Sequence, residues 1–307
     1  MSDVWLVLGG TLTGAVGPGI SVLYATYGEL ITERAGRINL GTEGSMLMGA
    51  CFGFIITVEA SSITVGVLVA MLAGAGLSLV LAYLVIYRDT NQLATGFALT
   101  LFGAGITAYA GRGYVDSTIG GLNPISIPLL SEIPKLGQAL FQQDILAYIA
   151  YVLGPLLFLG LHYTRTGLSL KAVGESIDVA FAAGRNPRVI QIAAIAAGGA
   201  LAGLGGAQLS LGLTHTWSEG MTVGRGFVAV GLVIFAMWSP LRAMVGAFLF
   251  GGAIGLQLQL QTVGAPISPF ILDMLPYLII LFVMALWSRA SARAMPEGLK
   301  GVLKATT

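Results

Sequence analysis

Long apolar runs recur along the whole chain, and they constrain its fold more than any other feature. Charged residues make up 9% of the 307 residues and apolar residues 56%. A soluble domain carries about 25% charged residues, because its surface must face water. The mean hydropathy of +0.87 likewise shows that the chain is apolar overall. The sequence therefore predicts an all-α, polytopic helical membrane protein.

The apolar runs predict eight or nine transmembrane helices. The uncertainty lies at 226–238, which is short for a helix that crosses a bilayer. The Gly17-Pro18-Gly19 sequence is expected to kink or break the first helix, a distortion that neighbouring helices can accommodate. The predicted segments are 12–32, 44–60, 63–87, 92–111, 145–163, 191–213, 226–238, 243–261 and 270–288.

Lysine and arginine are distributed unevenly when nine spans are threaded with the C-terminus inside. Of the 15 bases, only Arg112, Lys135 and Arg225 then lie outside, which leaves twelve inside. Because positive residues favour the cytoplasmic side, we expect a cytoplasmic C-terminus in a bacterial inner membrane. The whole chain, 1–307, is expected to form one transmembrane domain with an extracytoplasmic loop at 112–144 and a cytoplasmic segment at 164–190.

Several kinds of chemistry are absent from the sequence. Cys51 is the single cysteine, so neither a disulfide within the chain nor a cysteine metal site is expected. The chain has no Gly-Lys dipeptide and hence no GxxxxGK[ST] phosphate loop. Any nucleotide that drives it must therefore bind to a partner. The net charge of +1 gives no reason to expect a nucleic-acid partner.

The cytoplasmic segment 164–190 is expected to hold one short amphipathic helix. Apolar residues recur there every three or four positions, with Lys171, Glu175 and Asp178 on the other face. Gly184 before Asn186-Pro187 is typical of a helix end. A polar face with more acids than bases favours docking into a groove on a protein over lying in lipid headgroups. The expected apolar face is Leu170, Val173, Ile177, Phe181 and Gly184.

Two glycine-rich segments interrupt the apolar runs. One is "ERAGRINLGTEG" at 33–44, where Glu33, Arg34, Arg37 and Glu43 can pair with one another at the inner surface and Asn39 is a capping-type residue. The other is "EGMTVGRGFVAVG" at 219–231, which the threading places outside. Both contain Glu-Gly and lead into apolar helices, an arrangement typical of the inverted repeats of transporters. The alternative is a plain charged loop.

Four motifs together resemble one protein family. They are "ERAGRINLGTEGSMLMGA", "NQLATGFALTL", "LKAVGESIDVAFAAGRNP" and "EGMTVGRGFVAVGLVIFAMWSPLRAMVGAFLFG". In this order they resemble the transmembrane permease subunits of ABC importers for simple sugars and nucleosides, relatives of the ribose and branched-chain amino-acid permeases. The resemblance runs from about residue 20 to 288. It implies no enzyme activity on this chain, ATP and Mg on separate ATPase subunits, a second and longer permease, and an extracytoplasmic substrate-binding protein.

The resemblance also implies roles for particular residues. One departure is "GRNP" after the coupling region, where related sequences more often have a tyrosine in "YAG". The resemblance makes 36–44 a hinge beside the translocation path, and we extend that role to the glycines of 220–231. The implied coupling helix, which docks on the ATPase, contains Val173, Gly174, Glu175, Asp178, Ala182, Ala183 and Gly184. The expected hinge residues are Gly36, Asn39, Gly41, Glu43, Gly44, Gly220, Gly224 and Gly226.

Candidates for substrate contact are weaker. Asn91, Gln92, Gln257 and Gln261 are polar residues in or beside spans, where such groups are functional candidates. Gln257 and Gln261 share a helical face, from which they can form hydrogen bonds to a sugar or a base, or to a neighbouring helix. We favour the neighbouring helix. Glu29 and Asp273 lie near span ends, which favours a structural role. A nucleoside is the first expectation for the solute and a simple sugar the second; an ion-coupled secondary transporter is the alternative function.

Overall fold

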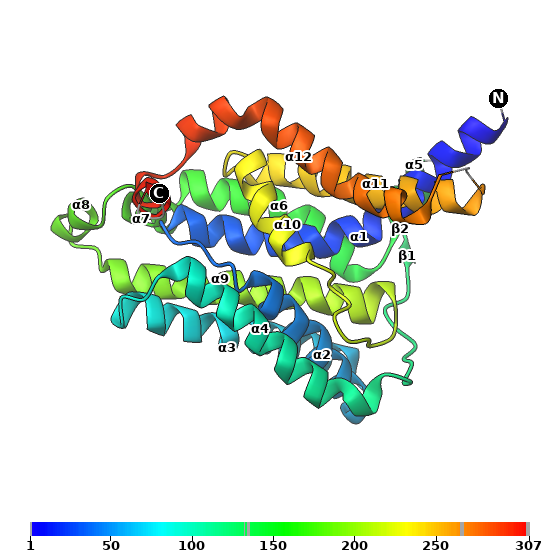
Figure 1. Ribbon diagram of the computed structural model, residues 1–307, viewed down its shortest axis with the longest axis horizontal. Coiled ribbons are helices and arrows are strands. Elements are labelled where there is room, and N and C mark those ends of the chain that lie inside the picture. The colour runs from blue at the N-terminus through cyan, green and yellow to red at the C-terminus, as the bar shows by residue number, and fades with distance from the viewer. Residues whose placement is uncertain (1, 132, 134–135, 265–266, 305–307) are drawn as a thin grey trace.

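The computed structural model describes residues 2–131, 133, 136–264 and 267–304. Within these residues the chain forms a bundle of long helices that run roughly along one direction (Figure 1). Two strands, β1 (Ile125–Ser126) and β2 (Gln142–Gln143), pair antiparallel. The longer helices are α1 (Ser2–Arg34), α2 (Thr42–Ala60), α3 (Ile63–Tyr87), α4 (Gln92–Gly111), α6 (Ile145–Tyr163), α9 (Pro187–Ala207), α11 (Pro240–Thr262) and α12 (Pro269–Ala294).

The remaining elements are short. The helices α5, α7, α8, α10 and α13 and the turns η1 and η2 connect or cover the longer ones. Their bounds are α5 (Leu136–Phe141), α7 (Arg165–Glu175), α8 (Ile177–Ala182), α10 (Arg225–Phe235), α13 (Glu297–Lys304), η1 (Arg112–Tyr114) and η2 (Gln208–Leu213).

The predicted class is confirmed: this is an all-α polytopic membrane protein. Six helices among the described residues are long and apolar enough to cross a membrane, namely α2, α3, α4 with η1, α6, α9 with η2, and α11. Two shorter apolar stretches are α10 and Phe270–Ile279 of α12. The helix α1 is continuous through Pro18, so the break considered there does not occur. Close packing of Gly19 against the backbone of Ala247 in α11 supports the helix at this point.

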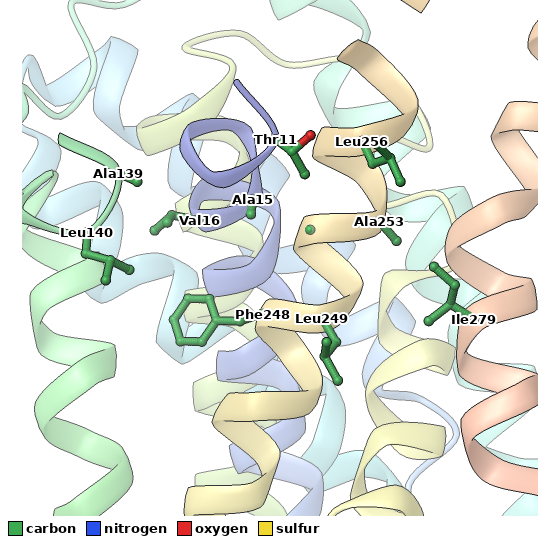
Figure 2. A pocket seen from close by; sticks show the side chains of 11 residues that line it. Thr11, Ala15, Val16, Ala139, Leu140, Phe248, Leu249, Ala253, Leu256 and Ile279 are labelled. Atoms are coloured by element: carbon green, nitrogen blue, oxygen red, sulfur yellow. The ribbon is translucent and has the colours of Figure 1, made fainter. Parts of the chain in front are cut away.

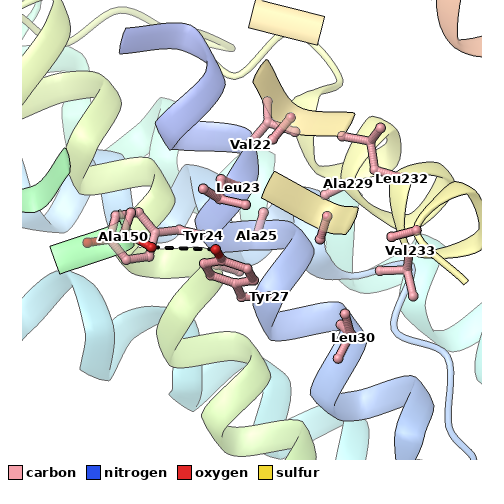
Figure 3. Packing of buried hydrophobic residues seen from close by; sticks show 14 of the residues in the cluster. Val22, Leu23, Tyr24, Ala25, Tyr27, Leu30, Ala150, Ala229, Leu232 and Val233 are labelled. Carbon is pink, nitrogen blue, oxygen red and sulfur yellow. Dashed lines mark hydrogen bonds between the residues drawn. The ribbon is translucent and has the colours of Figure 1, made fainter. Parts of the chain in front are cut away.

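The helix α1 lies at the centre of the bundle and packs against α9, α10 and α11. Its buried aromatic residues carry hydroxyl groups that need partners. The Tyr24 hydroxyl donates to the carbonyl oxygen of Leu146 at 2.6 Å, and the Tyr27 hydroxyl donates to that of Ala150 at 3.4 Å. These bonds fix α1 to the first turns of α6 (Figure 3).

Glycines allow the backbones of α2, α3 and α9 to touch. A Cβ atom on Gly49 would lie 2.1 Å from the carbonyl oxygen of Gly203, and one on Gly203 would lie 2.2 Å from that of Ala70. Apolar side chains gain little when they leave lipid to contact another helix, because lipid is apolar too. Helices in a membrane therefore associate through such close packing of small residues. The high glycine content therefore supports the packing of this bundle.

The segment 164–190 departs from the prediction of one amphipathic helix. It forms two helices, α7 and α8, separated at Ser176. Ser176 adopts an extended backbone, and its hydroxyl accepts a hydrogen bond from the backbone N–H of Val179 at 3.4 Å. Serine is a preferred N-cap because its side chain satisfies a free N–H group. The five apolar residues therefore do not share a face: Val173 is buried, whereas Phe181 is 70% exposed.

The predicted outer loop 112–144 is partly ordered by contacts with η2 and with the segment after it. The backbone N–H of Leu122 donates to the carbonyl oxygen of Leu211 at 3.0 Å, and that of Ile119 donates to His215 at 3.1 Å. The hydroxyl of Tyr148 donates to the carbonyl oxygen of Ile125 in β1 at 2.6 Å. Lys135, which the orientation argument uses, is outside the described residues.

Candidate functional site

The first glycine-rich segment is a buried loop, 35–41, between α1 and α2. The carboxylate of Glu29 in α1 accepts hydrogen bonds from the backbone N–H of Asn39 at 2.7 Å and from the hydroxyl of Thr42 at 3.0 Å. The backbone N–H of Ile38 donates to Oε1 of Gln92 in α4 at 3.2 Å. Glu29 therefore joins the end of α1 to the loop and to the first residue of α2. This is the structural role that its place near the end of a predicted span favours.

Further helices hold the same loop. Nε2 of Gln191 in α9 donates to the carbonyl oxygen of Ala35 at 3.1 Å, and the Asn39 amide donates to the hydroxyl of Ser78 in α3 at 3.1 Å. The Asn39 side-chain oxygen accepts from the backbone N–H of Gly41 at 2.8 Å. Buried polar groups need partners, and the backbone and side-chain groups of the loop obtain them from four helices. It is fixed in place in this conformation.

The second glycine-rich segment touches the first through Glu43. The Glu43 carboxylate accepts bonds from the Thr222 hydroxyl at 2.6 Å, the Gly224 N–H at 2.8 Å and the Gly226 N–H at 2.6 Å. The last two are free donors at the start of α10, a position that favours a negative charge. Position 226 requires glycine, because a Cβ atom there would lie 2.4 Å from the Cα of Glu43.

This contact corrects the placement of the two segments on opposite sides of the membrane. They meet inside the bundle, where α10 begins. The helix α10 has 11 residues, so it is about 16 Å long, roughly half of a ~30 Å bilayer core. A helix of that length can begin within the bundle instead of at its outer end.

The expected pairing among Glu33, Arg34, Arg37 and Glu43 is also wrong. Within the described part of the chain, these four form no ion pair with one another. Instead, Nε1 of Trp238 donates to Glu33 at 2.6 Å, while Arg34 donates from Nε and Nη2 to the carbonyl oxygen of Trp238 at 3.2 and 3.0 Å. Glu33 and Arg34 thus share a neutral partner, Trp238, which lies in the turn between α10 and α11, as expected for charged groups that are removed from water.

The helix α7 packs directly against the end of α1. Val173 is buried, and a Cβ atom on Gly174 would lie 2.2 Å from the carbonyl oxygen of Arg34. Partial burial and the neighbouring charge of Arg34 lower the pKa of the Lys171 ammonium. Two of the expected coupling residues, Val173 and Gly174, therefore contact this chain itself.

The helix α8 forms the exposed tip of the segment 164–190, at the far left of the bundle (Figure 1). Ile177, Val179 and Phe181 are 46%, 66% and 70% exposed. Exposed large apolar side chains on a short helix are typical of a docking site. The expected coupling residues Asp178, Ala182, Ala183 and Gly184 are exposed on and directly after this tip, and Glu175 is exposed just before it.

The four candidates for substrate contact lie in three different places. Asn91 is the N-cap of α4 and accepts from the N–H groups of Leu93 and Ala94. Gln92 is buried against the loop 35–41. Gln257 and Gln261 both donate to Oδ1 of Asp273 in α12, at 2.6 and 3.4 Å. The structure thus shows the helix-to-helix bonds favoured above.

A cavity of about 380 Å³ lies between α1, α5, α11 and α12. Figure 2 shows that its side chains are aliphatic or aromatic, with Thr11 at one end. Such a lining offers little to a polar solute, which needs hydrogen-bonding groups. We therefore place no substrate site there.

Trp238, Thr222, Gln191 and Ser78 belong to the polar contacts of this site and were not among the predicted residues. Gln191 and Ser78 are detectable in principle, because each is a polar group in an apolar run. Trp238 and Thr222 act through contacts more than 170 positions distant in the sequence, which no local pattern reveals.

Comparison with known proteins identifies the family. The model of the family described as "Branched-chain amino acid transport system / permease component" matches residues 11–284. The chain belongs to this family. It is a permease subunit of an ABC importer, and the permease components of this family work with an ATPase and a substrate-binding protein.

Three curated relatives are similar over most of their length. TsgC13 of Haloferax volcanii, provisionally named a glucose ABC transporter permease protein, is 39% identical over 85% of this chain and 80% of its own. The nucleoside ABC transporter permease protein NupC of Lactococcus lactis is 29% identical over 91% and 92%. The guanosine ABC transporter permease protein NupQ of Bacillus subtilis is 27% identical over 77% and 78%. No solved structure shows significant similarity.

Proposed function

We propose that this permease forms the translocation path for a nucleoside or a simple sugar that a substrate-binding protein delivers from outside the cell. The names of three relatives support this substrate class, since they refer to glucose, nucleosides and guanosine. Both kinds of solute are polar and rich in hydroxyl groups. We expect a nucleoside first and a simple sugar second as the transported solute.

ATP and Mg bind to a separate ATPase subunit in this proposal. The chain has no phosphate loop of its own, so the energy must enter through a contact. The observation that carries the proposal is the division of the cytoplasmic segment: α8 exposes Ile177, Val179 and Phe181, while α7 packs on the end of α1. The tip docks on the ATPase, and α7 passes its displacement to α1 and the loop 35–41.

The path itself runs beside the two glycine-rich segments. In this proposal Gly36, Asn39, Gly41, Glu43 and Gly44 on one side, and Gly220, Gly224 and Gly226 on the other, allow the spans to repack between outward and inward states. The N-termini of α2 and α10 meet at Glu43, which supports an inverted repeat of broken helices.

The same proposal covers the topology of the chain and its partner subunits. The chain is one permease domain over 1–307 with eight or nine spans, in a bacterial inner membrane with the C-terminus in the cytoplasm. A second and longer permease lines the other half of the pore. The cytoplasmic segment 164–190 faces the ATPase, and the outer loop 112–144 faces the binding protein.

Reconstitution of the full transporter in vesicles tests this function. We expect uptake of a labelled nucleoside or sugar that requires ATP, the ATPase and the loaded binding protein. Asp178→Lys on the exposed tip should lower uptake and substrate-stimulated ATP hydrolysis at least tenfold while the protein still inserts. Asp178 is a sharper target than Glu175, because Oε2 of Glu175 accepts from the backbone N–H of Glu297 at 3.2 Å.

Asp116→Lys is the matched control, since Asp116 is exposed in the outer loop. It should leave the coupling between ATP hydrolysis and uptake unchanged. Full activity of the Asp178 variant would remove the docking assignment. Accumulation by this chain alone, driven by an ion gradient and indifferent to ATP, would replace the proposal with the ion-coupled secondary transporter.

A further inference from the structure

A polar cluster lies on α11 and α12, apart from the buried loop 35–41. Nε2 of Gln257 donates to Oδ1 of Asp273 at 2.6 Å, and Nε2 of Gln261 donates to the same oxygen at 3.4 Å. Asp273 and Gln261 are exposed and Gln257 is partly so. The cluster thus gathers three polar side chains near the end of α11 on a face that the described residues leave open.

The hydrogen bonds inside the cluster leave mainly acceptors free. Both amide nitrogens donate to one carboxylate oxygen, and within the described residues Oδ2 of Asp273 and the two amide oxygens have no partner. An ionised aspartate only accepts hydrogen bonds. The arrangement therefore suits a ligand that brings several donors close together.

Asp273 is an ionisable group among exposed apolar side chains. It stands in the apolar stretch Phe270–Ile279 of α12. Its neighbours Phe270 and Met274 are 80% and 55% exposed. An ionisable group in an apolar helix is costly in lipid and is found almost always facing the bundle interior or a water-filled cavity. Because Asp273 is exposed within this chain, we take this face of α12 to meet water on the solute path.

Polar groups continue from the cluster towards the interior. Tyr277 lies one helical turn beyond Asp273, and its hydroxyl donates to the carbonyl oxygen of Val223 at 3.0 Å. Val223 stands between Thr222 and Gly224, which both bond to Glu43. The cluster is thus connected by successive contacts to the place where α10 begins.

We propose that Asp273, held by Gln257 and Gln261, binds the hydroxyl groups of a polyhydroxylated solute on its way through the permease. The free oxygen of Asp273 and the amide oxygens accept from neighbouring hydroxyls of a sugar ring or of the ribose of a nucleoside. Hydrogen bonds from hydroxyls to a carboxylate are the stronger kind. The inference rests on the proposed function and applies to either solute, because a sugar ring and the ribose of a nucleoside both carry neighbouring hydroxyl groups.

The test uses the complete transporter, reconstituted with its ATPase and its own binding protein. ATP-dependent uptake is measured for a hydroxylated solute and its deoxy analogue, for example glucose against 2-deoxyglucose or guanosine against 2′-deoxyguanosine, each at a saturating concentration of loaded binding protein. The same binding protein serves every variant, so its own preference cancels when the ratios of the two uptake rates are compared.

We expect the wild-type protein to prefer the hydroxylated solute. Asp273→Asn should lower its uptake about three- to tenfold, from the loss of one hydrogen bond to a charged group that is partly screened by water, and change uptake of the deoxy analogue little. Asp273→Glu should restore part of the preference. Gln259→Ala, on the same helix but outside the cluster, should leave the ratio unchanged.

A merely structural Asp273, which only joins α11 to α12, would lower both rates equally and keep the ratio, and that result would overturn the inference. If Asp273→Asn assembles poorly, Gln261→Ala keeps the bond between Gln257 and Asp273 and should shift the ratio in the same direction; an unshifted ratio there counts against the inference as well. No ATP-dependent uptake of either solute by the wild type would instead overturn the proposed function, and the inference with it.

Discussion

Replacing Glu43 with glutamine tests whether the two glycine-rich segments are held together by one buried carboxylate. Oε1 accepts from Thr222 and Gly224, and Oε2 accepts from Gly226. A glutamine that keeps its oxygen at the Oε1 position places an NH₂ group against the N–H of Gly226. Of the two orientations, this one loses the fewer bonds, since only the bond from Gly226 is lost.

The magnitude follows from the contacts. A lost hydrogen bond to a charged group costs about 1.5–3 kcal/mol, and the lost charge at a helix N-terminus costs about 0.3–2 kcal/mol. Relief from burying a charge offsets part of this, and polar contacts measured in membranes reach only about 0.6–1.7 kcal/mol. We expect a net loss of about 2 kcal/mol of stability, which is roughly 4–8 °C in apparent Tm.

The assay is thermal unfolding of the purified protein in detergent, followed by the fluorescence of its tryptophans. Glu59→Gln is the matched control, because it is the same change at the other end of α2. Glu59 is exposed and accepts one bond from the Tyr114 hydroxyl at 2.6 Å, so its loss should shift Tm by less than about 2 °C. Thr222→Val should fall between the two, since it removes one neutral donor.

Equal shifts in the Glu43 and Glu59 variants would refute this reasoning. A rise in Tm for Glu43→Gln would show that the burial of the carboxylate outweighs its three bonds. Glu43→Ala provides a second reading: it leaves two backbone N–H groups and a hydroxyl without an acceptor, so its Tm should fall below that of the glutamine variant.

Two further predictions follow from the packing and the loops. Gly203→Ala should prevent assembly or lower Tm by more than 5 °C, because the new Cβ would lie 2.2 Å from a backbone oxygen of α3 and overpacking costs about 1–3 kcal/mol or more. Gly105→Ala is the control and should be tolerated, since its Cβ meets nothing within 4 Å. Equal expression and equal Tm of the two variants would contradict the packing. Amide hydrogen exchange should be faster at 218–220, which is exposed, than at 35–41; similar rates would argue against a fixed first loop.

The sequence predicts most of the spans because their signal is local. The expected segments 63–87 and 145–163 coincide with α3 and α6. Each is a continuous apolar run bounded by polar residues, and lipid requires a run of that length to be helical. The class of the protein and the place of its exposed segment 175–185 in the chain follow from the same kind of local pattern.

The interior of the site could not be predicted, because its partners are distant in the sequence. Glu43 bonds to residues about 180 positions away, and Glu33 bonds to Trp238. The expectation that neighbouring charges pair was reasonable for a solvated loop and failed because this loop is buried. The break at Ser176 is different: serine is a good N-cap, so a local signal was present but apolar periodicity outweighed it.

The two glycine-rich segments differ in how freely they can move. The first is bonded to α1, α3, α4 and α9, so its displacement requires all four helices to shift with it or several buried bonds to break. In the second, Val223 is 66% exposed, and Cβ atoms on Gly220 and Gly224 would meet nothing within 4 Å. A push from α7 should therefore move α1 and the loop 35–41 as one body, while the turn before α10 changes shape. Glu43 bonds the first segment to the second, so in the proposed mechanism its three bonds set how tightly the moving loop is held to the turn that changes shape.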